Sequence, residues 1–220
     1  MTDTERKYVL GIDQGTTSSR TILFNHAGEV VSVGQLEHEQ IFPHAGWVEH
    51  DPMEIWDNVR QTVGMALGRA ESNHHEVAAV GITNQRETTI IWDRATGEPV
   101  YNAIVWQDAR SQDIVDRLAA DGGPDRFRAT VGETLSTYAS ITKIMWILEN
   151  VPGVRERAER GELAFGNPDT WLIWNMTGGV DGGVHVTDVT NASRTMLMDL
   201  RTLQWREDIC EIAGIPTSLL

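Results

Sequence analysis

The stretch with the residue types best suited to chemistry runs from Val9 to Arg20, V-L-G-I-D-Q-G-T-T-S-S-R. The apolar run Tyr8–Ile12 ends on the acid Asp13, and four small hydroxyl residues, 16–19, follow Gly15. This order predicts a strand, a tight turn and a second strand. Gly15 would allow a backbone with positive φ and the close approach of a ligand.

Two interpretations of this turn are compatible with its residues. In the first, Asp13 holds magnesium or its water ligands, while Thr16, Thr17, Ser18 and Arg20 donate hydrogen bonds or charge to phosphate oxygens. In the second, the segment is a β-hairpin whose polar residues only satisfy the turn. It is not the P-loop that opens a helix, because no Gly-Lys-Ser/Thr follows.

A second pair of interest is Arg86-Glu87, which follows the apolar segment Val77–Thr83. In open α/β sheets, ligands gather outside the ends of strands. A polyol suits such a pair, because arginine donates to hydroxyl oxygens and glutamate accepts from hydroxyl protons. The alternative is a solvated ion pair or a structural anchor at the strand end.

Other residues have weaker signals. Trp106 and Tyr138 could wall a ligand, although each alone is more typical of a core. The polar loop made by Asp188 and 191–194 could border a site, but turn chemistry is the preferred account. We expect Cys210 to be a core residue, because it has no nearby histidine.

Composition excludes several classes of function. The chain has 220 residues and a formal net charge of −14, which disfavours binding to nucleic acid or to anionic membranes. It has one cysteine, so no intrachain disulfide can form, and this is typical of a reducing compartment. We see no signal peptide and no membrane-spanning stretch, and therefore expect a cytoplasmic protein.

The positions of apolar residues predict an α/β fold. Tyr8–Ile12, Thr21–Asn25 and Val30–Gln35 are joined by short connections, which predicts an antiparallel meander. Asp51 and Pro52 should open a helix, with Glu54 completing a capping box. The strand Val77–Thr83 after that helix suggests a parallel crossover. The buried face of the helix should consist of Trp56, Val59, Val63, Ala66, Leu67 and Ala70.

The rest of the chain alternates short strands and helices. The predicted strands are Thr88–Trp92 and Leu163–Phe165, and Ala103–Trp106 is a short apolar run. The predicted helices are Ser111–Ala120, Ser140–Asn150, Val154–Arg160, Pro168–Met176 with Asn167 as its cap, and Trp205–Ala213. Trp47, in the loop before the first helix, should be a packed plug.

Several motifs, in this order, resemble those of the glycerol kinases, within the carbohydrate-kinase family that shares the fold of actin and the heat-shock ATPases. They are G-I-D-Q-G-T-T-S-S-R, G-W-V-E-H-D-P-M-E-I-W, G-I-T-N-Q-R-E-T-T, N-A-I-V-W-Q, Y-A-S-I-T-K-I-M-W-I-L-E-N, F-G-N-P-D-T-W-L-I-W and V-T-D-V-T-N-A-S-R-T-M-L. The resemblance runs from Tyr8 to Leu220.

The resemblance implies a ribonuclease-H-like domain with a mixed sheet flanked by helices. Residues 1–220 would form the amino-terminal domain, and a second domain, with the adenine pocket and the catalytic base, would lie beyond Leu220. The implied reaction is the transfer of phosphate from ATP to glycerol, giving sn-glycerol 3-phosphate, with Mg²⁺. The full-length enzyme would be a homo-oligomer.

The resemblance also implies a role for individual residues. Thr16, Thr17, Ser18 and Arg20 would bind nucleotide phosphates, and Asp13 would help to place magnesium. The remaining residues would bind glycerol: Arg86 and Glu87 its hydroxyls, Trp106 its carbons, and Tyr138 through its own hydroxyl. The family shows proline and phenylalanine around this tyrosine, where this chain has Thr137 and Ala139.

Two alternatives remain at this stage. One is a kinase of another polyol or sugar, such as xylulose or gluconate, in the same family. The other is a fragment that binds nucleotide or polyol without catalysis. We expect the 220-residue chain alone to have little or no turnover, because it would lack the catalytic base.

Overall fold

The computed structural model describes residues 6–220. The chain forms two compact units. Unit 1 contains residues up to 40 together with 51–85, and unit 2 contains residues 41–50 together with 86–220. Each unit has its own sheet and core, and we describe them separately.

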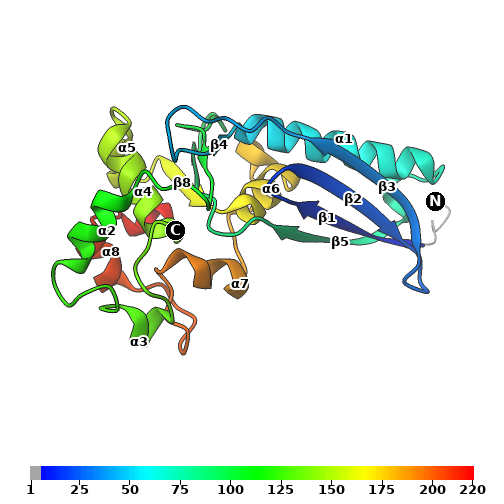
Figure 1. Ribbon diagram of the computed structural model, residues 1–220. Helices are drawn as coiled ribbons and strands as arrows, with labels where there is room; N and C mark the ends of the chain where they lie inside the picture. The colour runs from blue at the N-terminus through cyan, green and yellow to red at the C-terminus, as the bar shows by residue number, and fades with distance from the viewer. Residues whose placement is uncertain (1–5) are drawn as a thin grey trace. The chain divides into compact units, whose positions relative to one another are not determined.

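Unit 1 is built on one four-stranded sheet with the order β3-β2-β1-β5 (Figure 1). Strands β1 (Tyr8–Gln14), β2 (Ser18–Phe24) and β3 (Val30–Glu37) are antiparallel neighbours, and β5 (Val77–Asn84) is parallel to β1. The predicted meander and crossover are therefore confirmed. Each of the first two strands extends further towards the turn than we predicted, so that Ser18 is already part of β2.

Helix α1 (Pro52–Arg69) connects β3 to β5 and packs against β2 and β3. The helix comes very close to the sheet at Gly34, where an added Cβ would lie 2.3 Å from the carbonyl oxygen of Thr62. Polar contacts also join the layers: the hydroxyl groups of Thr21 and Thr62 are 2.9 Å apart, and Ser32 Oγ donates to the Ala66 carbonyl at 2.6 Å.

The predicted buried face of α1 was partly wrong. Val59 and Ala66 are buried as expected, whereas Val63, Leu67 and Ala70 are only partly buried. Trp56 is also only partly buried and has the guanidinium of Arg60 over its ring. The face is rotated because the sheet beneath presents small and polar residues, which accept a polar partner from the helix. The buried residues are Pro52, Ile55, Asn58, Val59, Thr62 and Ala66.

Unit 2 contains two small sheets and most of the helices. Strand β4 (Glu49–His50) pairs with β7 (Ala103–Ile104), and β6 (Ile90–Asp93) pairs with β8 (Leu163–Gly166), both antiparallel. The helices are α2 (Gln112–Ala119), α3 (Arg128–Val131), α4 (Ser140–Asn150), α5 (Val154–Glu159), α6 (Pro168–Met176), α7 (Val189–Ala192) and α8 (Glu207–Ala213). Short 3-10 turns are η1 (His74–Glu76, in unit 1), η2 (Gly179–Asp181), η3 (Ser193–Thr195) and η4 (Thr217–Leu219).

The core of unit 2 lies among α2, α4, α5, β8 and α8. Cys210 is buried in it, as predicted. Trp47 is a packed plug, as predicted: its ring meets Trp146 edge-on at 5.2 Å, and the guanidinium of Arg110 lies 3.8 Å from its centroid.

Two predicted capping interactions take a different form. Asp51 does cap α1 by accepting from the Met53 amide at 2.8 Å. The Glu54 carboxylate, however, accepts from the Glu39 amide at 3.1–3.2 Å, which ties the helix to the chain after β3. Asn167 occupies the cap position of α6 without a capping hydrogen bond, and its Nδ2 donates to the Thr88 carbonyl at 2.8 Å.

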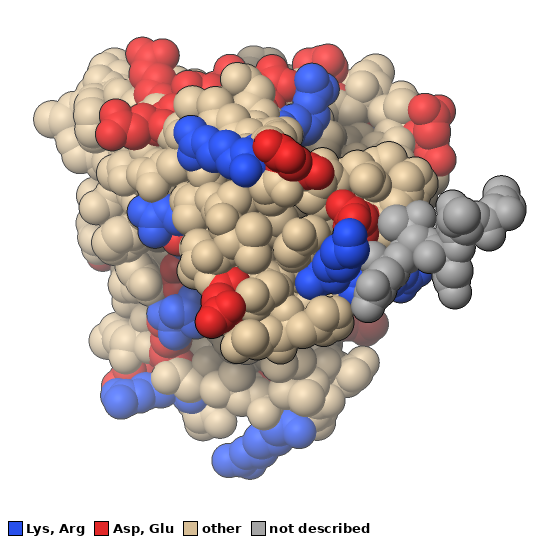
Figure 2. Space-filling view, turned by 90° about the vertical axis from the view of Figure 1, so that its right-hand side faces the viewer, with Lys and Arg blue, Asp and Glu red and all other residues tan. Residues whose placement is uncertain are grey.

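The surface of the described residues is acidic overall but mixed locally. On the face drawn in Figure 2, acidic and basic side chains are interspersed. Within residues 6–220, no helix combines the length and the apolar character needed to cross a membrane.

Candidate functional site

The turn between β1 and β2 places the first set of predicted residues at one end of the sheet of unit 1. Asp13 and Arg20 face each other across the strand pair, with Oδ2 and Nη1 3.9 Å apart. Both side chains are more than two-fifths exposed, so this ion pair is loose and both groups are accessible to a ligand. Arg20 is also oriented by Gln35, whose Oε1 accepts from Arg20 Nε at 2.9 Å.

Gly15 closes the turn in a way that the sequence did not predict. Its amide donates to the Ser18 carbonyl at 3.0 Å, and its φ is not positive. An added Cβ would lie 3.3 Å from that same oxygen. Close packing, and not a left-handed backbone, is therefore what favours glycine here.

The chain after β3 supports the turn from behind. The carbonyl of Thr16 accepts from His38 Nε2 at 2.9 Å and from Gln40 Nε2 at 3.0 Å. The His38 amide also donates to the Thr17 carbonyl at 3.3 Å. Burial lowers the pKa of His38, which favours the neutral form of the ring. The turn that carries Thr16, Thr17 and Ser18 is thus held by three hydrogen bonds.

In unit 2, Glu87 lies at the centre of the second set. Its side chain is buried, and its backbone has φ 66°, a left-handed conformation that is uncommon outside glycine. Its carbonyl accepts from Ser140 Oγ at 3.0 Å and from Thr89 Oγ1 at 3.2 Å. Asn167 Nδ2 in turn donates to Ser140 Oγ at 3.1 Å. Strained backbone held so firmly is typical of functional sites.

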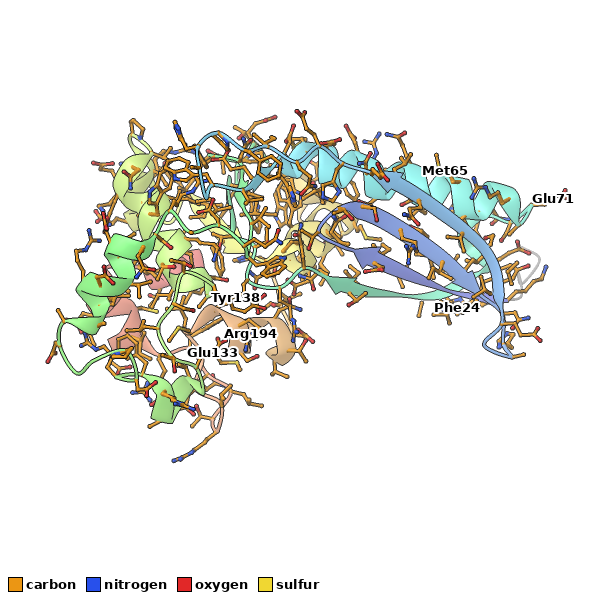
Figure 3. All side chains as sticks on the ribbon, in the orientation of Figure 1. Phe24, Met65, Glu71, Glu133, Tyr138 and Arg194 are labelled. Atoms are coloured by element: carbon orange, nitrogen blue, oxygen red, sulfur yellow. The ribbon has the colours of Figure 1, made fainter. Side chains whose placement is uncertain are left out.

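The charge partner of Glu87 is Arg194, which the sequence placed in a polar loop of uncertain purpose. The loop prediction was wrong, because this segment forms α7 and η3, and Arg194 lies in η3. Arg194 Nε donates to Glu87 Oε1 at 2.5 Å, and Arg194 Nη2 forms an ion pair with Glu133 Oε1. The guanidinium carbon lies 5.4 Å from the centroid of the Tyr138 ring. Figure 3 labels Glu133, Tyr138 and Arg194, which converge from separate segments of unit 2.

Two aromatic residues border this cluster. The rings of Trp106 and Tyr138 meet edge-to-face, with centroids 5.6 Å apart, and both side chains are half-buried. The Trp106 amide donates to Thr88 Oγ1 at 3.2 Å, next to Glu87 in the chain. Trp106 and Tyr138 therefore form one wall beside the Glu87–Arg194 pair.

Lys143 holds the segment that carries Tyr138. Its side chain is fully buried, and Nζ donates to the carbonyls of Thr137 at 2.5 Å and Tyr138 at 2.7 Å. Burial lowers the pKa of Lys143 to about 7, against the attraction of nearby acids that include Glu87 and Glu133. No sequence pattern pointed to this residue, because a lysine on an amphipathic helix is expected to face solvent.

Arg86 is exposed, next to the buried Glu87. Burial raises the pKa of Glu133, and the positive charges of Arg194 and Arg86 oppose that rise. Within the described part of the chain, no ion pair is formed by Arg86 itself, so its guanidinium is accessible for a ligand.

The predicted residues thus fall into two sets. The structure brings Asp13, Thr16, Thr17, Ser18 and Arg20 together in unit 1, and it brings Arg86, Glu87, Trp106 and Tyr138 together in unit 2. The first set offers an accessible carboxylate beside hydroxyl and guanidinium donors. The second offers a carboxylate acceptor and a guanidinium donor beside an aromatic wall, which is the chemistry needed to bind a small polyol.

Comparison with known proteins agrees with the fold. Residues 8–220 match the model for the amino-terminal domain of the FGGY family of carbohydrate kinases. A glycerol kinase of Clavibacter michiganensis is 68% identical over 214 residues, and one of Paenarthrobacter aurescens is 66% identical over 214 residues. In both cases the match covers 97% of this chain and 42% of the relative, so the chain spans about two-fifths of the length of these relatives.

Solved structures give the same picture. The crystal structure of Plasmodium falciparum glycerol kinase with ADP is 40% identical to this chain with a TM-score of 0.88, covering 96% of this chain and 42% of that one. The xylulose kinase of Rhodospirillum rubrum is 25% identical with a TM-score of 0.85, covering 97% of this chain and 42% of that one. The α/β fold class, shared with these actin-like sugar kinases, is therefore confirmed.

Proposed function

Since this chain belongs to the FGGY family of carbohydrate kinases, as an amino-terminal domain, we propose that it is the part of a glycerol kinase that supplies the groups for phosphate and for glycerol. The observation that carries the proposal is the cluster around Glu87 in unit 2. A buried carboxylate, an exposed guanidinium and an aromatic wall lie together there. The identity of 68% to a glycerol kinase favours glycerol over other polyols.

The proposed role of unit 2 is to bind the alcohol. Glu87 accepts hydrogen bonds from glycerol hydroxyls, and Arg86 donates to their oxygens. Trp106 packs against the carbon atoms, while the Tyr138 hydroxyl adds a polar contact. Phosphoryl transfer depends mainly on positioning and on charge stabilisation, and both need a rigidly held alcohol.

The proposed role of unit 1 is to bind the phosphates of ATP. Thr16, Thr17, Ser18 and Arg20 supply donors, and the turn is already fixed by His38 and Gln40. Asp13 suits Mg²⁺ because its carboxylate is accessible and because this ion keeps several of its waters in proteins. The metal would supply charge neutralisation on the phosphates.

A cytoplasmic location of the protein is also part of this proposal.

A coupled assay of ADP release tests the proposal on the complete polypeptide that the gene encodes. We expect phosphorylation of glycerol that depends on ATP and Mg²⁺, with weaker activity towards xylulose and gluconate. Arg86→Ala should raise the KM for glycerol by about tenfold or more, the cost of losing a charge-assisted hydrogen bond. A preference for xylulose or gluconate would assign a different substrate, and no activity on any of them would contradict the proposal.

The 220-residue chain alone should have at least about 10²-fold less activity, because the catalytic base is expected outside it. The same assay compares the two polypeptides at equal concentration. A rate for the short chain equal to that of the complete polypeptide would show that the base lies within residues 1–220.

A further inference from the structure

We propose that Arg194 is a positioning residue that fixes the carboxylate of Glu87 for the acceptor alcohol, and that Glu133 holds Arg194 in place. The inference rests on the proposed function and deepens it. It assigns a role to the polar loop 188–194, which turn chemistry alone does not explain.

The two carboxylate oxygens of Glu87 have different surroundings. Oε1 accepts from Arg194 Nε at 2.5 Å, while Oε2 takes no hydrogen bond from the described residues. A buried carboxylate with one oxygen restrained presents its second oxygen in a fixed direction. A hydroxyl group of the alcohol can donate to this second oxygen, which receives no hydrogen bond from residues 6–220.

Arg194 is itself held in place by an acid and an aromatic ring. Its Nη2 forms an ion pair with Glu133, and its planar group lies against the Tyr138 ring. Arg194 therefore links Glu87, Glu133 and the aromatic wall in one arrangement. A guanidinium can do this because it donates from several nitrogens in one plane, whereas an ammonium has a single nitrogen.

The segment that carries Arg194 is fixed by its own hydrogen bonds. Asp188 caps α7 by accepting from the Asn191 amide at 2.9 Å. Thr195 is buried and closes η3, since its hydroxyl donates to the Ala192 carbonyl at 2.7 Å and accepts from the Leu197 amide at 3.0 Å. The polar residues of the loop thus build a rigid support, and Arg194 is the one whose side chain reaches Glu87.

Arg194 also neutralises two neighbouring negative charges. Glu87 and Glu133 both approach the same guanidinium, and the negative charge of Glu87 is one cause of the raised pKa of Glu133. Without Arg194, two partly buried carboxylates would repel each other across the gap. One of them would move or take up a proton, and the direction of Glu87 Oε2 would be lost.

Steady-state kinetics on the complete polypeptide encoded by the gene test this inference. Arg194→Ala should raise the KM for glycerol by about 10- to 100-fold, with the KM for ATP unchanged within about twofold. Arg194→Lys should recover part of the loss, because an ammonium can reach one acid but not both. Glu133→Gln should raise the glycerol KM by only about threefold, because the amide oxygen still accepts from Arg194.

The matched control is Arg117→Ala, which removes an exposed arginine of unit 2 paired with Glu149. It should leave both KM values unchanged. Thermal melting checks that each variant is folded. If Arg194→Ala does not fold, Arg194→Lys and Glu133→Gln carry the test, and an unchanged glycerol KM in both would overturn the inference.

A double-mutant cycle separates positioning from a general structural effect. If Arg194 acts through Glu87, then Glu87→Gln together with Arg194→Ala should cost no more than Glu87→Gln alone. Additive losses, or equal rises in the KM for glycerol and for ATP, would overturn the inference while leaving the proposed function intact. Absence of glycerol phosphorylation by the unsubstituted polypeptide would overturn both.

Discussion

The ammonium nitrogen of Lys143, a fully buried residue of α4, lies 2.7 Å from the carbonyl oxygen of Tyr138, which precedes that helix. Replacing Lys143 by methionine would leave this carbonyl and that of Thr137 without their donor. We expect the free energy of unfolding to fall by about 1–3 kcal/mol, the cost of unsatisfied buried groups. The glycerol KM of the complete polypeptide should also rise. Urea denaturation and glycerol kinetics measure the two effects, and a variant unchanged in both would contradict the prediction.

The same lysine predicts a pH dependence. Burial lowers its pKa to about 7 in the native state from 10.5, so between these values the unfolded chain binds the extra proton. The free energy of unfolding should therefore rise with pH between about 7 and 10.5, relative to Lys143→Met. Urea denaturation of both proteins at several pH values gives this difference. Parallel curves would show that Lys143 does not titrate in this range.

For Asp169 we expect the opposite pH dependence, with the free energy of unfolding falling as pH rises in the acidic range. Its carboxyl group is buried, Oδ2 accepts from Thr187 Oγ1 at 2.7 Å, and Oδ1 has no partner among the described residues. Burial raises its pKa to about 6 from 3.8, so the native state binds the proton more tightly. Stability should fall by about 3 kcal/mol as pH rises from 3.8 to above 6. Asp169→Asn should lose this dependence in urea denaturation, and a variant with the wild-type slope would refute the assignment.

Arg110 should be among the most sensitive residues of unit 2. Its side chain is fully buried, and its two Nη atoms each lie 2.8 Å from a carboxylate oxygen, one of Glu49 and one of Asp108. Arg110→Met would leave two buried acids without their cation, so we expect a loss of about 3–5 kcal/mol in the free energy of unfolding. Arg117→Met, which breaks an exposed pair, should cost no more than about 1 kcal/mol. Equal losses in urea denaturation would contradict the argument.

Gly34 should tolerate no side chain. A Cβ there would meet the Thr62 carbonyl at 2.3 Å and Met65 Cβ at 2.9 Å, so α1 would have to move from the sheet. We expect Gly34→Ala to destabilise the protein by about 1–3 kcal/mol. Gly64→Ala, on α1 with nothing near its Cβ position, should instead stabilise it by about 1 kcal/mol. Thermal denaturation of both variants tests the contrast, which fails if they shift Tm in the same direction.

Local patterns predicted the elements well. The bounds of α4 and α6 agree with the sequence, because apolar spacing and the flanking Pro152 or Asn167-Pro168 mark their ends. Strand bounds were less accurate: the strand predicted at Thr88–Trp92 is β6, which runs from Ile90 to Asp93. Short strands end where pairing ends, and pairing depends on a partner elsewhere in the chain.

Contacts between distant residues limited the prediction of the site. Glu87 and Arg194 are 107 positions apart, and nothing in either local sequence indicates the other. The only indication in the sequence was that one arginine, Arg194, stands among residues that commonly cap helices and turns. Lys143 was missed for a related reason: its acceptors are carbonyl groups, which any sequence supplies.

The Thr16 carbonyl, which accepts hydrogen bonds from both His38 and Gln40, has a consequence for the β1–β2 turn. An oxygen engaged twice has no lone pair left to turn towards a visiting anion. Substituting either donor would leave one lone pair of this oxygen free, and that lone pair would repel the phosphate that the turn is proposed to bind. Two side chains that are not themselves proposed to contact the nucleotide would thus influence whether its phosphates bind at this turn.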